Sequence, residues 1–228
     1  IDTANRRFFF FSSACRPFGM VNLSPGTARS GAWEAGYRYD SEYIHDFSHV
    51  HAWQLAGIAV LPCTGPVRGH EGSEAFKSRF SHDDETVAPG YHAVHLTDYD
   101  IGAELTATDR VGFHRYNFPE SDTSHILFDL GTELGPCEMS DCHAHMVSET
   151  RIEGFVEGSA TRRRPKATRI HFIAEFDRPV LEFGGWMNGA LDSDCKEISG
   201  KDSGAYVRFD TREERTIQMK VAISYCNV

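Results

Sequence analysis

Histidine and aromatic residues alternate within one short stretch of this sequence, between residues 45 and 53. If the stretch is an extended strand, the two-residue period of its side chains places three imidazoles, one phenyl and one indole on the same face. These residues are His45, Phe47, His49, His51 and Trp53. An indole can stack on the C–H face of a pyranose, while imidazoles exchange hydrogen bonds with its hydroxyls. The pattern therefore predicts a sugar contact from His49, His51 and Trp53.

Two other interpretations of the same histidines stay open. Alternate residues of a strand can ligate one zinc or iron ion, so His49 and His51 could form a metal site with His45 as a third ligand. No carboxylate or fourth histidine follows at the spacing that commonly completes such a site. We therefore expect no metal ligand in this chain. The histidines could also be structural, with their hydrogen bonds satisfied inside the protein.

Further candidates for sugar binding precede the histidine stretch. Trp33 lies in a glycine-bearing connection where little regular structure would bury its ring, and aromatic residues of loops are often functional. The alternative is a ring folded over the edge of the core. Tyr37, Tyr39 and Asp40 follow directly, and the Asp40 carboxylate could accept a hydrogen bond from a hydroxyl or cap the next turn.

Catalytic residues are not marked by any motif of the sequence. The G-x-S-x-G turn of serine hydrolases is absent, and none of the many carboxylates forms a recognisable pair of the kind that glycoside hydrolysis requires. Cys137, Cys142, His143 and His145 are metal-ligand types, but their spacing matches no structural zinc pattern. The acidic run at 83–85 lacks the spacing of a calcium loop, and we expect a solvated turn there.

The bulk composition is that of an ordinary globular protein. The chain has 228 residues, 40% hydrophobic and 25% charged, with a formal net charge of −10. This charge argues against nucleic acid or an anionic membrane as a partner. No apolar run approaches the roughly 18 residues of a membrane span. The six cysteines form no C-x-x-C pair, and we expect them mainly as buried apolar side chains.

Alternating segments recur about every ten residues along the chain, with turn residues between them. The clearest form a hairpin, Ile101–Ala107 and Val111–Phe118, joined by Thr108-Asp109-Arg110. No helical period is sustained. We therefore predict an all-β protein, a large antiparallel β-sandwich that forms a single domain over residues 1–228. Other expected strands are Tyr91–Leu96, Ser124–Leu130, His145–Ile152, Gly154–Gly158, Arg169–Phe176, Val180–Phe183, Ala205–Asp210 and Thr216–Tyr225.

Several segments, in one order along most of the chain, resemble the N-terminal domain of glycoside hydrolase family 92, the calcium-dependent exo-acting α-mannosidases. They are RPFGMVNLSPGT at 16–27, the stretch at 36–57, FSHDDETVAPGYHAVHLT at 80–97, IGAELTATDRVGFHRYNFP at 101–119 and RRPKATRIHFIAEFDRPVLEFGG at 163–185. The family often has SHTHLSG where this chain has SHVHAWQ. The resemblance therefore leaves the sugar specificity open at Trp53.

The resemblance implies a galactose-mutarotase-like sandwich that packs on a helical (α/α)6 barrel, expected after Val228. That barrel would carry the catalytic acid and base and most of the calcium ligands, so we assign no catalytic or metal residue here. A pocket for the terminal mannose of α-mannoside glycans would form at the junction of the two domains. On the sandwich side it would include Arg16 to Gly19, Tyr37 to Asp40, and the SHVHAW segment.

The same resemblance implies a periplasmic or secreted, inverting exo-α-mannosidase whose sandwich alone is inactive. Two alternatives remain from the residues. One is a stand-alone carbohydrate-binding module, which needs no catalytic partner. The other is a β-scaffold metalloenzyme that uses His49 and His51.

Overall fold

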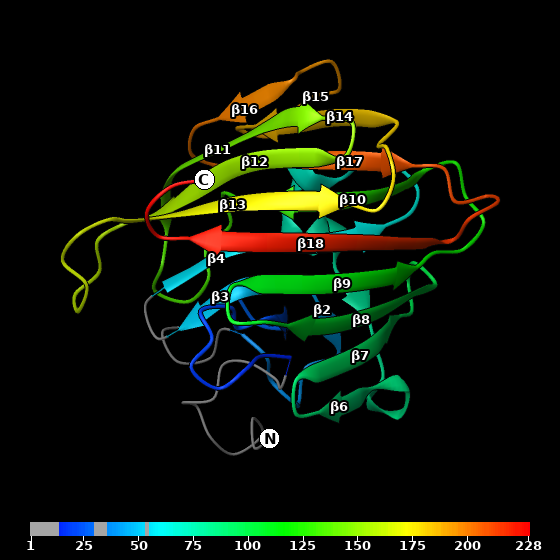
Figure 1. Ribbon diagram of the computed structural model, residues 1–228, viewed down its shortest axis with the longest axis horizontal. Helices are drawn as coiled ribbons and strands as arrows, with labels where there is room; N and C mark the ends of the chain where they lie inside the picture. The colour runs from blue at the N-terminus through cyan, green and yellow to red at the C-terminus, as the bar shows by residue number, and fades with distance from the viewer. Residues whose placement is uncertain (1–13, 30–35, 53–54) are drawn as a thin grey trace.

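Two antiparallel β-sheets face each other in the computed structural model, which describes residues 14–29, 36–52 and 55–228 (Figure 1). The first sheet has seven strands. In spatial order they are β1 (Ser24–Gly26), β3 (Asp46–Ala52), β4 (Leu55–Cys63), β10 (Ser124–Asp129), β17 (Ser203–Phe209), β14 (Glu182–Met187) and β15 (Ala190–Asp192).

The second sheet has nine strands, and Figure 1 looks onto its outer face. Every strand pair in both sheets is antiparallel, which confirms the predicted all-β antiparallel sandwich. In spatial order the strands are β16 (Glu197–Ser199), β11 (Met139–Ser148), β12 (Arg151–Gly158), β13 (Thr168–Phe176), β18 (Thr216–Ser224), β9 (Val111–Asn117), β8 (Ile101–Ala107), β7 (Tyr91–Leu96) and β6 (Thr86–Ala88).

The β8–β9 hairpin shows how sequence alternation sets the layers. Ile101, Ala103 and Leu105 are buried, whereas the residues between them are at least partly exposed. A strand with one face on the core and one on solvent alternates in this way. The hairpin turn at 108–110 is closed by a hydrogen bond from the Thr108 amide to the Val111 carbonyl.

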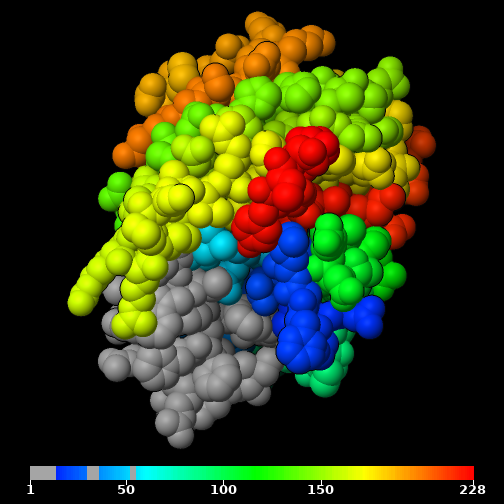
Figure 2. Space-filling view, turned by 60° about the vertical axis from the view of Figure 1, so that its left-hand side comes forward, coloured from blue at the N-terminus to red at the C-terminus, as the bar shows by residue number. Residues whose placement is uncertain are grey.

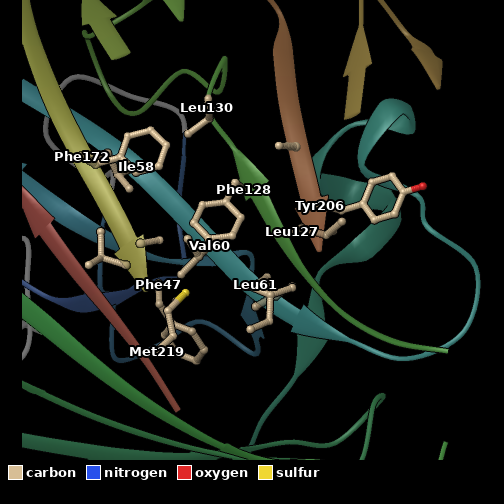
Figure 3. Close-up of a cluster of buried hydrophobic side chains, with 14 of the residues drawn as sticks. Phe47, Ile58, Val60, Leu61, Leu127, Phe128, Leu130, Phe172, Tyr206 and Met219 are labelled. Atoms are coloured by element: carbon tan, nitrogen blue, oxygen red, sulfur yellow. The ribbon is translucent and has the colours of Figure 1, made fainter. Parts of the chain in front are cut away.

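The main core fills the space between the two sheets. Phe128 from the seven-stranded sheet stacks on Phe172 from the nine-stranded sheet at 6.2 Å between ring centroids, and Phe47 stacks on Tyr116 at 6.1 Å. Figure 3 shows Phe128 and Phe172 together with Val60 in this layer. Burial of large apolar side chains is the main driving force for such a sandwich.

The seven-stranded sheet also packs against the chain between β4 and β6, where η1 contacts β14 and β17. Gly69 of η1 lies so close to the Trp186 ring that an added Cβ would be 2.4 Å from it. The short elements of this connection are η1 (Gly69–Glu71), α1 (Ser73–Phe76), β5 (Ser78–Arg79) and η2 (His82–Asp84). Strand β5 pairs with β2 (Tyr43–Ile44) in a separate two-stranded sheet.

Cysteines and helices add two further facts. All six cysteines are free thiols. Cys63, Cys137 and Cys142 are buried, as predicted, whereas Cys226 is exposed. Among the described residues no helix is long and apolar enough to cross a membrane.

Candidate functional site

The predicted strand over the histidine stretch exists as β3, but its histidine face points into the sandwich. His49 is completely buried and contacts His114 of β9, with 4.8 Å between the ring centroids. Gly112 makes room for it, since a Cβ there would lie 2.8 Å from the imidazole. The prediction that His49 contacts a sugar is therefore wrong. The alternation correctly placed Phe47 and His49 on one face of β3. The nine-stranded sheet covers this face, so neither side chain reaches the surface.

The His49 ring belongs to a hydrogen-bonded chain whose direction is fixed. Its Nδ1 donates to the Ile58 carbonyl at 2.7 Å, because a carbonyl can only accept. Since the lowered pKa values favour neutral rings, its Nε2 accepts from Nε2 of His114, 2.8 Å away. The other ring nitrogen of His114 accepts from the Tyr116 hydroxyl at 2.7 Å. All four ring nitrogens of the two imidazoles are thus satisfied.

Protonation of this chain of rings is unfavourable. Burial lowers the pKa of His49 to about 4, and burial together with the neighbouring His49 lowers the pKa of His114 well below its ordinary value. A charged imidazole here would lose the solvation that water gives it in the unfolded chain. The pair is therefore structural, and its nitrogens offer no free lone pair to a metal ion.

The metalloenzyme alternative loses its principal ligand with His49. His45, the suggested third ligand, is buried near Glu74, with 3.7 Å between Nδ1 and Oε1. Across residues 14–29, 36–52 and 55–228 no three His, Cys, Asp or Glu side chains are arranged to hold a metal ion.

Glu85 organises a second polar cluster, which the sequence did not indicate. Its carboxylate accepts from the Tyr37 hydroxyl at 2.8 Å and pairs with Nδ1 of His82 at 2.6 Å and Nε2 of His92 at 2.8 Å. Only 5% of its side chain is exposed, so the expected solvated turn is wrong at this residue. Burial would raise the pKa of Glu85, but the hydrogen bonds from His92, His82 and Tyr37 outweigh it and lower the pKa.

Two acceptors favour the charged form of His82. Its Nδ1 faces the Glu85 carboxylate, and its Nε2 donates to the Tyr39 carbonyl at 2.6 Å. Burial alone would lower the pKa of His82, but these hydrogen bonds raise it. The Tyr39 ring stacks on this imidazole at 4.1 Å with only 5° between the planes. An imidazolium is attracted to the face of an aromatic ring, and this attraction holds the Tyr39 ring in place.

Tyr39 and Asp40 are the predicted residues that reach the surface in this region. Tyr39 is 50% exposed and Asp40 is exposed as well. Tyr37, in contrast, is 4% exposed with its hydroxyl on Glu85, so it positions the loop and cannot contact a sugar directly. The cluster thus presents one rigid aromatic face beside an exposed carboxylate. These are the groups that pyranose recognition needs.

The alternation of the Tyr91–Leu96 segment could have revealed part of the Glu85 cluster. It places His92 on the buried face together with Val94 and Leu96. A buried imidazole needs a hydrogen-bond partner, and the acidic run at 83–85 is the nearest source in sequence.

Arg16 lies in an exposed loop that packs on the β8–β9 turn. Its side chain is 60% exposed, and its Nε lies 3.9 Å from the Asp109 carboxylate. The neighbouring Phe18 is fully exposed and has a φ of 62°, a left-handed conformation that is rare for a large side chain. In Figure 2 this part of the chain, in blue, adjoins the C-terminal residues, in red. An exposed phenyl ring on such a loop favours a surface that another part of a protein covers.

The remaining predicted residues have mixed outcomes. His51 is 5% exposed near the end of β3, and its contact with a sugar stays a prediction. Trp33 and Trp53 lie outside the described residues. Arg16 and the Tyr39–Asp40 pair are therefore the predicted residues that the structure places at the surface.

Comparison with known proteins identifies the family. The family described as "Glycosyl hydrolase family 92 N-terminal domain" matches residues 1–224 of this chain. The family GH92 α-mannosidase BT3965 from Bacteroides thetaiotaomicron, solved in complex with mannoimidazole, superimposes with a TM-score of 0.83 at 26% identity. The match covers 98% of this chain and 32% of that chain.

Two further structures share the fold. The GH92 glycosyl hydrolase ccman5 has a TM-score of 0.79 at 24% identity and covers 99% of this chain and 32% of that chain. The inverting GH92 mannosidase BT2199 from Bacteroides thetaiotaomicron has a TM-score of 0.79 at 20% identity, covering 98% and 29%. No curated protein matches. This chain spans about a third of the length of these solved proteins. It belongs to glycosyl hydrolase family 92 and corresponds to the N-terminal domain of that family.

Proposed function

We propose that this chain is the sandwich domain of an exo-acting α-mannosidase that releases terminal mannose from α-mannoside glycans. The observation that supports this most is the family match over residues 1–224, together with the 26% identical structure of an α-mannosidase that binds mannoimidazole. We also propose a helical (α/α)6 barrel as the partner domain of the same polypeptide, and a periplasmic or secreted location.

The role of this chain in that enzyme is to bind and orient the sugar. Tyr39 offers an aromatic face whose other side rests on the charged His82 ring. Asp40 can accept hydrogen bonds from hydroxyls of the bound sugar, and Arg16 can donate them. Glu85 holds His82 in place, so the binding face is rigid before the sugar arrives, which lowers the cost of binding.

The chemical step is assigned to the partner domain. An inverting glycosidase needs an acid that protonates the leaving oxygen and a carboxylate that activates water from the opposite face. We assign neither role to the exposed acids near Tyr39. The contribution of Tyr39, Asp40 and Arg16 is therefore to substrate affinity and orientation.

Calcium is the cofactor that we propose for the complete enzyme, because of the family resemblance. In the described residues no group of carboxylates and histidines has the arrangement of a metal site. We therefore place the calcium ligands mainly in the partner domain. When bound, calcium would supply a positive charge that holds sugar hydroxyls.

The test uses the complete product of the native gene. Mannose release from α-mannosides is measured with and without a calcium chelator, for the parent protein and for Tyr39→Ala and Asp40→Asn. Loss of a hydrogen bond from a charged group predicts about a 10- to 100-fold lower kcat/KM for Asp40→Asn. Asp122→Asn is the matched control, because Asp122 is an exposed acid of another loop. If the parent releases no mannose from any α-mannoside, the proposal is wrong.

A further inference from the structure

The outer face of the nine-stranded sheet carries a groove that the sugar site at Tyr39 does not use. Its volume is about 730 Å³, and a second hollow of about 650 Å³ continues it along the same face. The two share the side chains of Glu104, Arg115 and Gln218. Strands β7, β8, β9 and β18 form its floor, and Figure 1 looks onto this face. Ligand pockets usually have volumes of roughly 300 to 1,000 Å³.

Aromatic rings lie in the first part of the groove. The sheet register places Tyr91, Thr106, Phe113 and Lys220 side by side on four adjacent strands. Tyr91 and Phe113 are half-buried, so each ring is held by its neighbours yet keeps an accessible surface. A short hydroxyl side chain, Thr106, separates them. Two held rings on an open sheet are a platform for flat, partly apolar ligands.

Planar polar side chains form the next row. Glu104, Arg115 and Gln218 are cross-strand neighbours on β8, β9 and β18. Arg115 binds the Glu104 carboxylate, and on the far wall Lys220 pairs with Glu175 at 3.0 Å. Each cation of the groove is thus paired with a carboxylate. The carboxylate, guanidinium and amide groups of this row use only part of their hydrogen-bonding capacity on one another. The remaining donors and acceptors can bind a ligand rich in hydroxyls.

These features select the ligand class. A nucleic acid or another polyanion would meet Glu104, Glu175 and Asp177 in a chain of net charge −10, so a neutral ligand is favoured. The groove crosses from β7 to β13, four strand spacings, or about 19 Å. That length suits a short chain of linked rings better than a single small molecule.

We propose that this groove binds a neutral oligosaccharide, with pyranose faces on Phe113 and Tyr91 and hydroxyls on Glu104, Arg115 and Gln218. The site is made of residues other than those near Tyr39, and it is independent of which glycosidic bond the complete enzyme cleaves. It would hold a glycan chain at a position separate from the sugar that is hydrolysed. The prediction concerns binding by this chain and needs no catalysis.

The experiment measures binding to the 228-residue chain by amide chemical shifts in NMR titrations. The probes are linear manno-, gluco- and galacto-oligosaccharides of about three to five units, the length that the groove holds. We expect at least one probe to bind with a dissociation constant of about 1 mM or lower. The largest shifts should fall on β9 and β18, around Phe113 and Gln218. Phe113→Leu keeps an apolar side chain but removes the ring, and should weaken binding about threefold to tenfold.

Matched variants distinguish binding in this groove from binding near Tyr39. Gln218→Ala changes an exposed groove residue and should also weaken binding, whereas Phe155→Leu makes the same ring deletion on the same sheet face outside the groove and should leave it unchanged. Tyr39→Ala alters the other candidate site and should have no effect. If no probe binds, or if shifts fall only around Tyr39, the groove proposal is wrong. Mannose release by the complete enzyme would be unaffected by that result.

Discussion

Acidification should destabilise this domain through its buried histidines. His49, His114 and His125 are all buried, and their pKa values are lowered, to about 4 for His49 and His125. The main cause at each is burial of the ring. In the unfolded chain the same imidazoles titrate near pH 6.5. As the pH falls below about 6.5, protons therefore bind to the unfolded chain first and stabilise it relative to the fold.

The size of the effect follows from the two pKa values. Between pH 7 and pH 5, an imidazole with an unfolded pKa of about 6.5 and a folded pKa of about 4 costs about 2 kcal/mol of stability. His49 and His125 together cost about 4 kcal/mol, and the lowered pKa of His114 acts in the same direction. This is a large part of the whole stability of many domains, about 5–15 kcal/mol. His82 acts in the opposite direction. Its raised folded pKa stabilises the protein at low pH and loses this effect as the pH rises.

Urea unfolding of the chain at a series of pH values measures this free energy directly. We expect a fall of several kcal/mol from pH 7 to pH 5, with uptake of about two protons by His49 and His125 on unfolding near pH 5.5 and further uptake by His114. His125→Gln should remove about one proton of this uptake. His95→Gln is the control, because it makes the same substitution at a side chain that is 38% exposed. A free energy of unfolding at pH 5 that equals the value at pH 7 would refute the assignment of neutral buried histidines.

Two further substitutions test the buried polar groups. Arg29→Leu leaves the carboxylates of Asp46 and Asp129, now 2.9 and 2.8 Å from the guanidinium, buried without a countercharge, and should cost about 3–5 kcal/mol in urea unfolding at pH 7. This cost should shrink as the pH falls, because burial raises the pKa of Asp129 and its carboxylate becomes neutral. Tyr116→Phe removes the hydroxyl that donates to His114 and should cost about 1–3 kcal/mol by the same measurement.

The controls for these two variants lie on the surface. Arg162→Leu and Tyr225→Phe make the same chemical changes at exposed positions and should alter the free energy of unfolding by less than about 0.5 kcal/mol. A cost for Arg29→Leu that is independent of pH would contradict the role of the two carboxylates. A Tyr116→Phe protein as stable as the parent would contradict the directed hydrogen-bond chain.

Local patterns predicted much of the fold. Tyr91–Leu96 and Ile101–Ala107 are strands with the bounds that their alternation gives, because one face meets the core and the other meets solvent. The expected strand at 145–152 was wrong. β11 ends at Ser148 and β12 begins at Arg151, so the chain reverses inside that segment. The turn between them, at Glu149 and Thr150, contains neither glycine nor proline, and nothing local marks it.

The candidate site was less predictable because burial depends on contacts distant in sequence. Alternation placed Phe47 and His49 on one face of β3 correctly. Which face is covered is decided by β9, whose His114 lies 65 residues further along the chain. The same holds for Glu85, which becomes buried only because Tyr37 approaches it from 48 residues before. Patterns within a segment carry no information about such partners.

The edge strands of both sandwich sheets are short. In the described part of the chain, each of the two sheets of the sandwich terminates on both sides in a strand of three residues, namely β1, β15, β16 and β6. Longer exposed edges can pair with strands of other molecules and seed aggregation, and short edges prevent this. Pro25 in β1 also removes one amide donor from its edge. The sandwich should therefore remain dispersed at high concentration, a favourable property for the NMR titrations.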